Sequence, residues 1–411
     1  MSTPARVFMD VSYTRTQDGN VGITRTVRRL ADELRAHPVV FHSSGFRVAP
    51  ATTETAARAS GRDGLATRAF RSASQGVGRR IAAALPAGLL HRIWSGVSTR
   101  MFDAMSRREP RVAFRPGDWL VLADQSWNYA AWRAVARARR EGAFTVLVVY
   151  DLIPLRHPEY CPPLFTRAFG AWLRAMLACC DAVVCISGAT RDDLRRWCAE
   201  QRLTSPPMGH FRLGSDLPAT PHAGTVRPEV EAFTRGASPF FAAVGSIEPR
   251  KNHRQLLDVF ERLWEAGSDA RLAVAGRPHP SCAAIAAQLQ RPGRGDRLLT
   301  LFDASDAEIA LLYERSRALV FPTLAEGFGL PLVEARTRGA PVIASDLPAL
   351  AELADGGVDL FPPGDDEALA RLVCSHAEES RRPSVGAMAL FSWADSAAQL
   401  IARASRLRDP A

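Results

Sequence analysis

The sequence predicts an α/β protein with two doubly wound, Rossmann-like domains, and three observations support this fold class. Short apolar runs alternate with helical stretches over most of the chain, which is typical of parallel sheets. The chain has 411 residues, more than one domain usually holds, and 47% of them are hydrophobic, which is enough for two cores. A stretch rich in Pro, Gly and Thr at 216–228 favours a domain boundary there.

Apolar runs with strand character occur in both halves of the chain. In the first half they are Arg6–Asp10, Val39–His42, Trp119–Ala123, Thr145–Val149 and Ala182–Ile186. In the second half they are Phe240–Val244, Leu272–Ala275, Leu298–Phe302, Leu319–Phe321 and Val342–Ala344. Each half therefore holds enough strands for its own sheet. We expect an N-terminal domain over residues 1–218, a C-terminal domain over 219–387, and a final helical segment over 388–411.

The positive charge is concentrated in one insert of the first domain. The formal net charge is +9, and residues 51–115 contain 12 Arg against 4 acidic residues. Within this insert, Ile81–Arg108 mixes Leu, Ile, Trp, Met and Phe with Arg, as basic amphipathic helices on membranes do. We expect an anionic membrane surface to contact residues 64–108, and no nucleic acid partner. The alternative is a helical insert packed on the domain with a solvated Arg face.

Cysteine usage and the N-terminus indicate a cytoplasmic protein. The seven cysteines are odd in number and show no CxxC spacing, so reduced thiols are expected and a zinc site is not. The start, MSTPARVFMD, lacks the apolar stretch of a signal peptide, and no apolar run is long enough to span a bilayer. We therefore expect a cytoplasmic enzyme, peripheral on the inner face of the plasma membrane if the insert binds lipid.

The strongest chemical signal is the segment Glu326–Glu334, which follows the expected strand Leu319–Phe321. Its sequence, EGFGLPLVE, predicts a glycine loop followed by a helix, because Pro331 suits the first helical turn and Gly339 suits the helix end. Glycine loops let backbone N–H groups approach a ligand, and a helix N-terminus favours a diphosphate. The two carboxylates can accept hydrogen bonds from sugar and ribose hydroxyls. A simple loop with a helix-starting proline is the structural alternative.

A second signal is the segment Val244–Asn252, which also follows a strand and precedes an expected helix at Gln255–Glu265. It contains Arg250 and Lys251, and Lys251 is the only lysine beside 51 arginines. Ligands of open α/β sheets bind at the carboxyl ends of strands, where two cations can hold a pyrophosphate and neutralise its growing charge. Paired with the Glu326 loop in one sheet, this segment favours a nucleotide-sugar site over an exposed basic turn.

These segments resemble a known family. GSIEPRKN, FPTLAEGFGLPLVEA and PVIASDLPAL together resemble the family 4 retaining glycosyltransferases of GT-B fold. The resemblance extends over essentially the whole chain and is densest from Phe240 to Gly364. It implies two Rossmann-like domains that face a cleft, with a C-terminal helix crossing back to the N-terminal domain.

The resemblance also implies roles for individual residues. Arg250 and Lys251 would bind the donor diphosphate and assist its departure, Glu326 would lie by the transferred sugar, and Glu334 would bind the ribose. The other implied donor contacts are Gly22, Gly245, Ser246, Gly327, Phe328, Gly329 and Leu330. Many relatives carry an Arg soon after the first glycine of the phosphate loop, whereas this chain has Ser246, which leaves Arg250 and Lys251 as the main cations.

The acceptor side departs further from the family pattern. Asp151 and its neighbours are implied to line this side, but relatives often have His where this chain has Tyr150. His157, seven residues later, is a candidate substitute, and a surface loop histidine is an equally good interpretation.

The resulting hypothesis is a metal-independent, retaining hexosyltransferase without a cofactor. No DxD triplet flanked by strand residues is present, so cations and a helix dipole replace a metal. The family resemblance favours attack and departure on one face of the sugar, with GDP-mannose as the first choice of donor. The acceptor would be a lipid-linked or growing surface glycan, as in lipopolysaccharide or exopolysaccharide biosynthesis. The alternatives are a nucleotide-sugar epimerase on the same scaffold and a non-catalytic nucleotide-sugar or glycan-binding protein.

Overall fold

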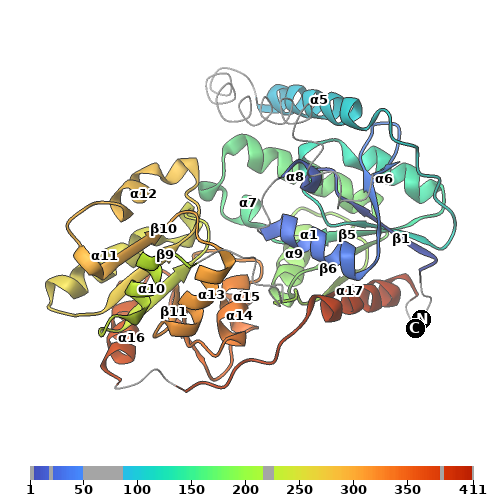
Figure 1. Cartoon of the computed structure of the whole chain (residues 1–411). Helices are drawn as coiled ribbons and strands as arrows, with labels where there is room; N and C mark the ends of the chain where they lie inside the picture. Colours follow the sequence, from blue (N-terminus) through green and yellow to red (C-terminus); the bar gives the residue numbers. More distant parts are fainter. Residues whose placement is uncertain (1–3, 18–21, 50–86, 216–225, 380–383, 410–411) are drawn as a thin grey trace. The chain divides into compact units, whose positions relative to one another are not determined.

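The protein folds into two separate α/β units. The computed structural model describes residues 4–17, 22–49, 87–215, 226–379 and 384–409 (Figure 1). The N-terminal unit contains residues 1–213 and 393–411, and the C-terminal unit contains residues 214–392. The boundaries between the units therefore lie after residues 213 and 392. They differ by a few residues from the boundaries after 218 and 387 that the sequence predicts. Residues 388–392 belong to the C-terminal unit, where the N–H of Met388 donates to the carbonyl of Arg336.

The N-terminal unit is built on a seven-stranded sheet in the order β3-β2-β1-β4-β5-β6-β7. Only β3 is antiparallel to its neighbour, and the other pairs are parallel. The strands are β1 (Arg6–Asp10), β2 (His37–Val40), β3 (Arg47–Val48), β4 (Asp118–Leu122), β5 (Phe144–Val149), β6 (Ala182–Cys185) and β7 (Met208–His210). The order reverses direction between β1 and β4, which is where doubly wound sheets bind ligands.

Helices connect these strands and cover the sheet (Figure 1). They are α1 (Gly22–Glu33), α5 (Ala87–Ser106), α6 (Ala131–Arg140), α7 (Ile153–Arg156), α8 (Pro163–Cys179), α9 (Gly188–Glu200) and α17 (Trp393–Arg408), with short 3-10 turns η1 (Thr14–Thr16), η3 (Ser126–Asn128) and η4 (Pro158–Tyr160). The terminal helix α17 packs on α1, β6 and β7. Its buried face repeats at helical spacing through Trp393, Ser396, Leu400 and Ala404.

The C-terminal unit contains a six-stranded, fully parallel sheet in the order β10-β9-β8-β11-β12-β13. The strands are β8 (Phe240–Val244), β9 (Arg271–Ala275), β10 (Leu298–Leu301), β11 (Leu319–Phe321), β12 (Val342–Ser345) and β13 (Val358–Phe361). The helices are α10 (Pro228–Arg235), α11 (His253–Glu265), α12 (Ala283–Leu289), α13 (Asp306–Arg315), α14 (Leu330–Thr337), α15 (Pro348–Ala351) and α16 (Asp366–Glu378), with 3-10 turns η5 (Pro249–Lys251), η6 (Pro280–Cys282) and η7 (Gly295–Arg297).

The predicted fold class is confirmed, and every strand expected from the sequence forms with small changes at its ends. Three strands were missed: β3, β7 and β13. Each lacks a clear apolar run, since β3 has two residues and β7 contains Gly209 and His210. The apolar run of the edge strand β13 is interrupted by Asp359. The exposed carboxylate of Asp359 lies 2.8 Å from His376 Nε2.

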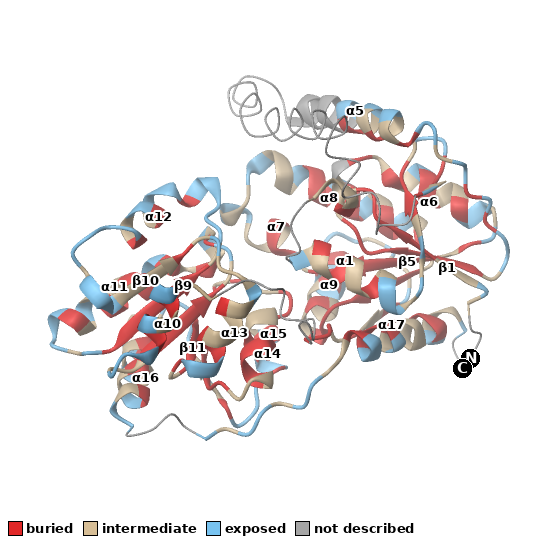
Figure 2. Ribbon diagram, viewed as in Figure 1, coloured by how far each residue is buried: buried red, intermediate tan, exposed pale blue. Residues whose placement is uncertain are grey.

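Each unit has its own hydrophobic core, and the central strands are buried throughout (Figure 2). Strands β4, β8 and β9 are buried at every position, as expected for parallel strands covered on both faces. All seven cysteines are free thiols.

The basic insert is described only in part. Residues 51–86 lie outside the described residues, and Ile81–Arg108, expected to be helical, forms α5 from Ala87 to Ser106. Helix α5 packs on α8 of the N-terminal unit. Among the described residues, no helix is long and apolar enough to cross a membrane.

Two glycines let the loops after β8 and β9 lie against each other in the C-terminal unit. The N–H of Gly245 donates to Ala275 O at 2.9 Å, and the N–H of Ile247 donates to Arg277 O at 2.9 Å. A Cβ atom on Gly276 would lie 1.8 Å from the carbonyl oxygen of Gly245, a backbone atom that cannot rotate away. The residue at 276 must therefore be glycine for the loop at 245–252 to keep this path.

We expect Gly276→Ala to lower the free energy of unfolding by about 3 kcal/mol, because the added methyl group forces the two loops apart. Urea unfolding followed by circular dichroism measures this change. Gly356→Ala is the matched control, since a Cβ there meets nothing within 4 Å, and its effect should stay within about 0.5 kcal/mol. Equal midpoints for the two variants would contradict the close approach.

Candidate functional site

The two loops singled out in the sequence meet in the C-terminal unit. They follow β8 and β11, which are neighbours in the sheet, so their carboxyl ends lie at the same edge. The N–H of Leu324 donates to the carbonyl of Arg250 at 2.7 Å. The guanidinium of Arg250 donates from Nη1 to the carbonyl of Ala325 at 2.9 Å. These bonds join the loop at 245–252 to the loop at 322–329.

Four side chains of these loops form one ionic cluster around Glu326. Its Oε1 atom accepts from Lys251 Nζ at 2.5 Å, from Arg250 Nη1 at 2.9 Å and from Thr323 Oγ1 at 3.0 Å. Glu248 holds the other end of Arg250, because its Oε1 accepts from Nη2 at 3.0 Å. Two cations are thus fixed side by side at the ends of adjacent strands.

Lys251 is buried in this cluster, directly against the Glu326 carboxylate. Its side chain is 9% exposed, and Nζ lies 4.6 Å from the centre of the Phe321 ring. Burial lowers the pKa of Lys251, and the Glu326 carboxylate opposes that effect. Burial would raise the pKa of Glu326, but the charges of Lys251 and Arg250 outweigh it and hold that pKa below its ordinary value. Lys251 and Glu326 therefore form a buried ion pair in which each group favours the charged form of the other.

His253 is a neighbour of the cluster that sequence reasoning did not single out. It is the first residue of α11 and is 6% exposed. Burial, and next the charge of Lys251, lower the pKa of His253 to about 4. The ring is therefore neutral at physiological pH and adds no charge beside the cations. A histidine two residues after the motif lysine was the sequence signal that could have pointed to it.

The segment after Glu326 has the predicted loop-helix structure. Helix α14 begins at Leu330, has Pro331 in its first turn, and ends before Gly339, which has a positive φ of 67°. Gly329 precedes the helix with φ of 113°, and a Cβ there would lie 2.5 Å from Leu350 Cδ2. Gly329 therefore has to be glycine for the helix N-terminus to occupy this place.

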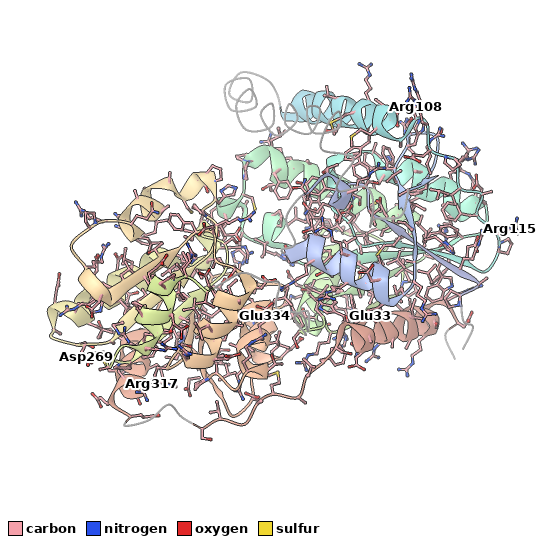
Figure 3. All side chains as sticks on the ribbon, viewed as in Figure 1. Glu33, Arg108, Arg115, Asp269, Arg317 and Glu334 are labelled. Atoms are coloured by element: carbon pink, nitrogen blue, oxygen red, sulfur yellow. The ribbon has the colours of Figure 1, made fainter. Side chains whose placement is uncertain are left out.

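The remaining donor-side residues also lie at this edge of the C-terminal unit. Glu334 comes from α14 and is 6% exposed, and its Oε2 accepts from the Tyr313 hydroxyl at 3.1 Å (Figure 3). Gly327 and Phe328 are buried. In the chain they lie between Glu326 and the start of α14. Ser246 is exposed, and its hydroxyl donates to Glu248 Oε1 at 2.5 Å.

The residues expected on the acceptor side, and Gly22, belong to the N-terminal unit. Gly22 is the first residue of α1 and is exposed. Asp151 lies two residues before the start of α7, and its Oδ1 accepts from the N–H of Ile153 at 3.0 Å. Tyr150 is buried, and its hydroxyl donates to Ala123 O at 2.7 Å. This bond ties the Tyr150 hydroxyl to the backbone directly after β4.

His157 has a surface environment. Its side chain is 41% exposed, Nδ1 lies 3.3 Å from Glu159 Oε1, and the ring stacks on Tyr160 at 5.7 Å. These contacts fit the surface-loop interpretation of this histidine.

A buried acidic pair in the N-terminal unit was missed by the sequence analysis. Asp10 ends β1 and Asp124 follows β4, the two strands at the reversal of the sheet order. Asp10 accepts from the Tyr129 hydroxyl at 2.8 Å. Asp124 accepts from the N–H groups of Tyr13 and Thr14 at 2.7 and 2.9 Å. The pair therefore holds the loop after β1 on the sheet.

The pKa of Asp124 reflects this environment. Burial, and next the charge of Asp10, raise the pKa of Asp124 to about 7 from 3.8. Single acidic residues at strand ends are common, so only their convergence across β1 and β4 identifies the pair. In the part of the chain that the structure describes, no group of three or more His, Cys, Asp or Glu side chains is arranged to hold a metal ion.

We expect the buried acid at position 124 to make stability decrease as pH rises from about 5 to about 8. In this range the folded state keeps a proton that the unfolded chain has released, so the free energy of unfolding falls with increasing pH. The stability advantage of the wild type over Asp124→Asn should therefore shrink by a few kcal/mol, on the order of 3, across this range. Urea unfolding of both proteins at several pH values measures it, and a constant or growing difference would contradict the raised pKa.

Comparisons with known proteins agree with this geometry. The sequence profile described as "Glycosyl transferases group 1" matches residues 230–383, which include the whole ionic cluster and α14. The serotype-specific mannosyltransferase WbdA of Escherichia coli is 34% identical over 274 residues, covering 64% of this chain and 34% of the relative. The chain thus spans about a third of that relative's length.

A second relative and a solved structure extend the comparison. The GDP-mannose-dependent alpha-(1-6)-phosphatidylinositol dimannoside mannosyltransferase of Mycobacterium tuberculosis is 26% identical over 277 residues, covering 66% of this chain and 70% of the relative. The structure of sucrose-phosphate synthase from Thermosynechococcus elongatus matches with a TM-score of 0.59 at 16% identity, covering 98% of this chain and 94% of that one. That likeness concerns the fold, which is GT-B. Residues 230–383 therefore match the group 1 glycosyl transferases, and the whole chain has the GT-B fold.

Proposed function

We propose that this protein is a retaining glycosyltransferase that moves a hexose from a nucleoside-diphosphate sugar to a glycan acceptor. The observation that carries the proposal is the convergence of Arg250 and Lys251 on Glu326, at the carboxyl ends of β8 and β11 and beside the start of α14. Two fixed cations and a helix N-terminus are suited to a diphosphate.

The proposed chemistry depends on charge that develops as the sugar leaves. When the bond between the anomeric carbon and the phosphate oxygen breaks, negative charge grows on the diphosphate. Arg250 and Lys251 stabilise that charge without reorganising, because Glu326 and Glu248 already hold them in place. The acceptor hydroxyl attacks from the same face of the sugar, and its proton passes to the leaving phosphate oxygen.

Glu326 has two tasks in this proposal. It orients Arg250 and Lys251, and its carboxylate lies where it can accept a hydrogen bond from a hydroxyl of the transferred sugar. We do not assign it a covalent role. Since two protein cations supply the charge stabilisation, the reaction is proposed to need no divalent metal and no cofactor.

We propose GDP-mannose as donor and a lipid-linked or growing surface glycan as acceptor, as in lipopolysaccharide biosynthesis at the cytoplasmic face of the membrane. The names of the two relatives support this choice, since both are mannosyltransferases and one is GDP-mannose-dependent. Glu334 is the proposed partner of the donor ribose, because its buried carboxylate can accept from two vicinal hydroxyls.

GDP-mannose at 100 times its dissociation constant should stabilise the protein by about 2.7 kcal/mol, and equal concentrations of UDP-, dTDP- and ADP-sugars should stabilise it less. A thermal-shift series measures this. Glu334→Gln should weaken donor binding about tenfold, because a neutral amide replaces a charged acceptor. Glu265→Gln, an exposed position on α11, should bind normally. A larger thermal shift with another nucleotide sugar would reject GDP-mannose as the donor. No thermal shift with any of the nucleotide sugars would reject the proposed donor site.

Lys251→Ala should lower the rate constant of transfer by about 100-fold or more, since one cation is lost from the departing diphosphate. Arg254→Ala is the control, because Arg254 is exposed on α11 and pairs with Asp258. Radiolabelled transfer to acceptor, with and without EDTA, gives the readout. Unchanged transfer by Lys251→Ala would reject the proposed mechanism, and loss of activity with EDTA would reject metal independence. Conversion of the donor without acceptor would instead favour an epimerase.

A further inference from the structure

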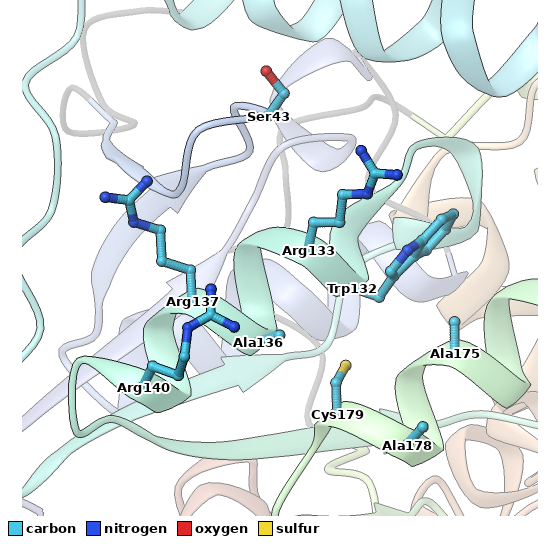
Figure 4. Close-up of a pocket in the computed structure, with 9 residues that line it drawn as sticks. All are labelled: Ser43, Trp132, Arg133, Ala136, Arg137, Arg140, Ala175, Ala178 and Cys179. Atoms are coloured by element: carbon cyan, nitrogen blue, oxygen red, sulfur yellow. The ribbon is translucent and has the colours of Figure 1, made fainter.

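A groove on the N-terminal unit lies apart from the strand ends and has no assigned role. It runs between α6 and α8, with Ser43 from the loop between β2 and β3 at one side (Figure 4). Its volume is about 570 Å³. Helix α6 supplies arginines together with Trp132 and Ala136, and α8 supplies small side chains.

The charged side is a stripe of three arginines on α6. Arg133, Arg137 and Arg140 are spaced by four and three residues, which places them on one face of the helix (Figure 4). Arg137 is engaged, since Nε lies 3.1 Å from Glu141 and Nη1 donates to Ser44 O at 3.0 Å. Arg133 and Arg140 are exposed, and neither forms an ion pair with an acidic residue of the described ranges. The stripe therefore carries uncompensated positive charge.

The opposite side is apolar and formed by small residues. The indole of Trp132 is half-buried, and small side chains beside it leave the groove open. These small residues are Ala136 on α6 and Ala175, Ala178 and Cys179 on α8 (Figure 4). The groove thus offers guanidinium groups next to a surface that favours hydrocarbon.

Helix α5 is joined to the edge of this groove by hydrogen bonds. The loop residue Ser43 binds Asp103 of α5 twice, with its N–H and its hydroxyl each donating at 2.6 Å. Farther along α5, Val97 is 53% exposed and Arg100 is exposed. Helix α5, which packs on α8, therefore adds an exposed apolar and an exposed basic side chain to the N-terminal unit.

We propose that the α6–α8 groove docks the protein on a membrane by binding the phosphate of an anionic lipid. The guanidinium groups of Arg133 and Arg140 bind the phosphate oxygens, since guanidinium forks match phosphate geometry. Trp132 and the alanines contact the first carbons of the lipid chains, as tryptophan does at bilayer interfaces. Nucleic acid fits less well, because strand-binding grooves present several stacking aromatics along a basic track.

This inference goes beyond the proposed transfer reaction, because it concerns where the protein docks and not what it transfers. It adds a surface centred on α6 to the membrane contact expected at residues 64–108, of which 64–86 lie outside the described residues. Donor binding measured by thermal shift with GDP-mannose reports the transfer site separately from lipid binding. Failure of one proposal is therefore distinguishable from failure of the other.

Flotation of the full chain with vesicles tests the proposal. The wild type should float with phosphatidylcholine vesicles containing phosphatidylglycerol and should not float with phosphatidylcholine alone. Arg133→Gln combined with Arg140→Gln should weaken binding about 30-fold, from about 1 kcal/mol for each arginine at an anionic surface. The matched control, Arg291→Gln with Arg297→Gln, removes the same charge from exposed positions of the C-terminal unit and should bind like wild type.

A second measurement reports the groove itself. Phosphatidylglycerol with brominated chains should quench part of the tryptophan fluorescence, and Trp132→Phe should remove that part while the protein still floats. Equal binding by the Arg133/Arg140 variant and the wild type would overturn the proposal. Absence of flotation, or binding to a single-stranded RNA oligomer in place of vesicles, would overturn it as well.

Discussion

The contact between the loops after β8 and β11 is the interaction on which the candidate site depends. Arg250 and Lys251 carry like charges in a buried place, and they stay together because Glu326 accepts hydrogen bonds from both. A buried charge without a partner would cost several kcal/mol, so the three groups are stable only as a set. The parallel sheet makes the set possible by bringing the ends of two neighbouring strands to one edge. The cations are consequently in place before any ligand arrives, which is what charge stabilisation in a transition state requires.

The N-terminal unit uses its strand ends differently. There the buried groups are two acids, Asp10 and Asp124, and backbone N–H groups and hydroxyls satisfy them in place of cations. The loop after β1 is held by these bonds, and α1 begins at Gly22 a short distance further along the chain. In both units, buried ionisable side chains at the strand ends fix a loop: two cations paired with Glu326 in the C-terminal unit, and two acids in the N-terminal unit.

Positive side chains serve three separate purposes in this protein. Arg336 is almost fully buried and is saturated by Asp355 and by carbonyl oxygens, so its charge serves the fold. Arg133 and Arg140 are exposed and unpaired among the described residues, so their charge is available to a partner. Lys251 stands apart as the only lysine. Its compact ammonium fits between the Glu326 carboxylate and the Phe321 ring, where the wider fork of an arginine would need more room.

The sequence by itself determined the fold class, most strands and the donor-side segments, because apolar runs, glycines and Pro331 express local constraints that hold in any parallel α/β sheet. It could not reveal β13 or β7, whose few residues pair only because the sheet edge is already formed. Nor could it identify the Asp10 and Asp124 pair, since 114 residues separate two acids that only the reversal of strand order brings together. The tertiary structure alone decided that the Tyr150 hydroxyl binds a backbone carbonyl, and that three arginines of α6 face the small residues of α8. Local sequence specifies what a segment prefers, whereas long-range packing decides which side chains meet.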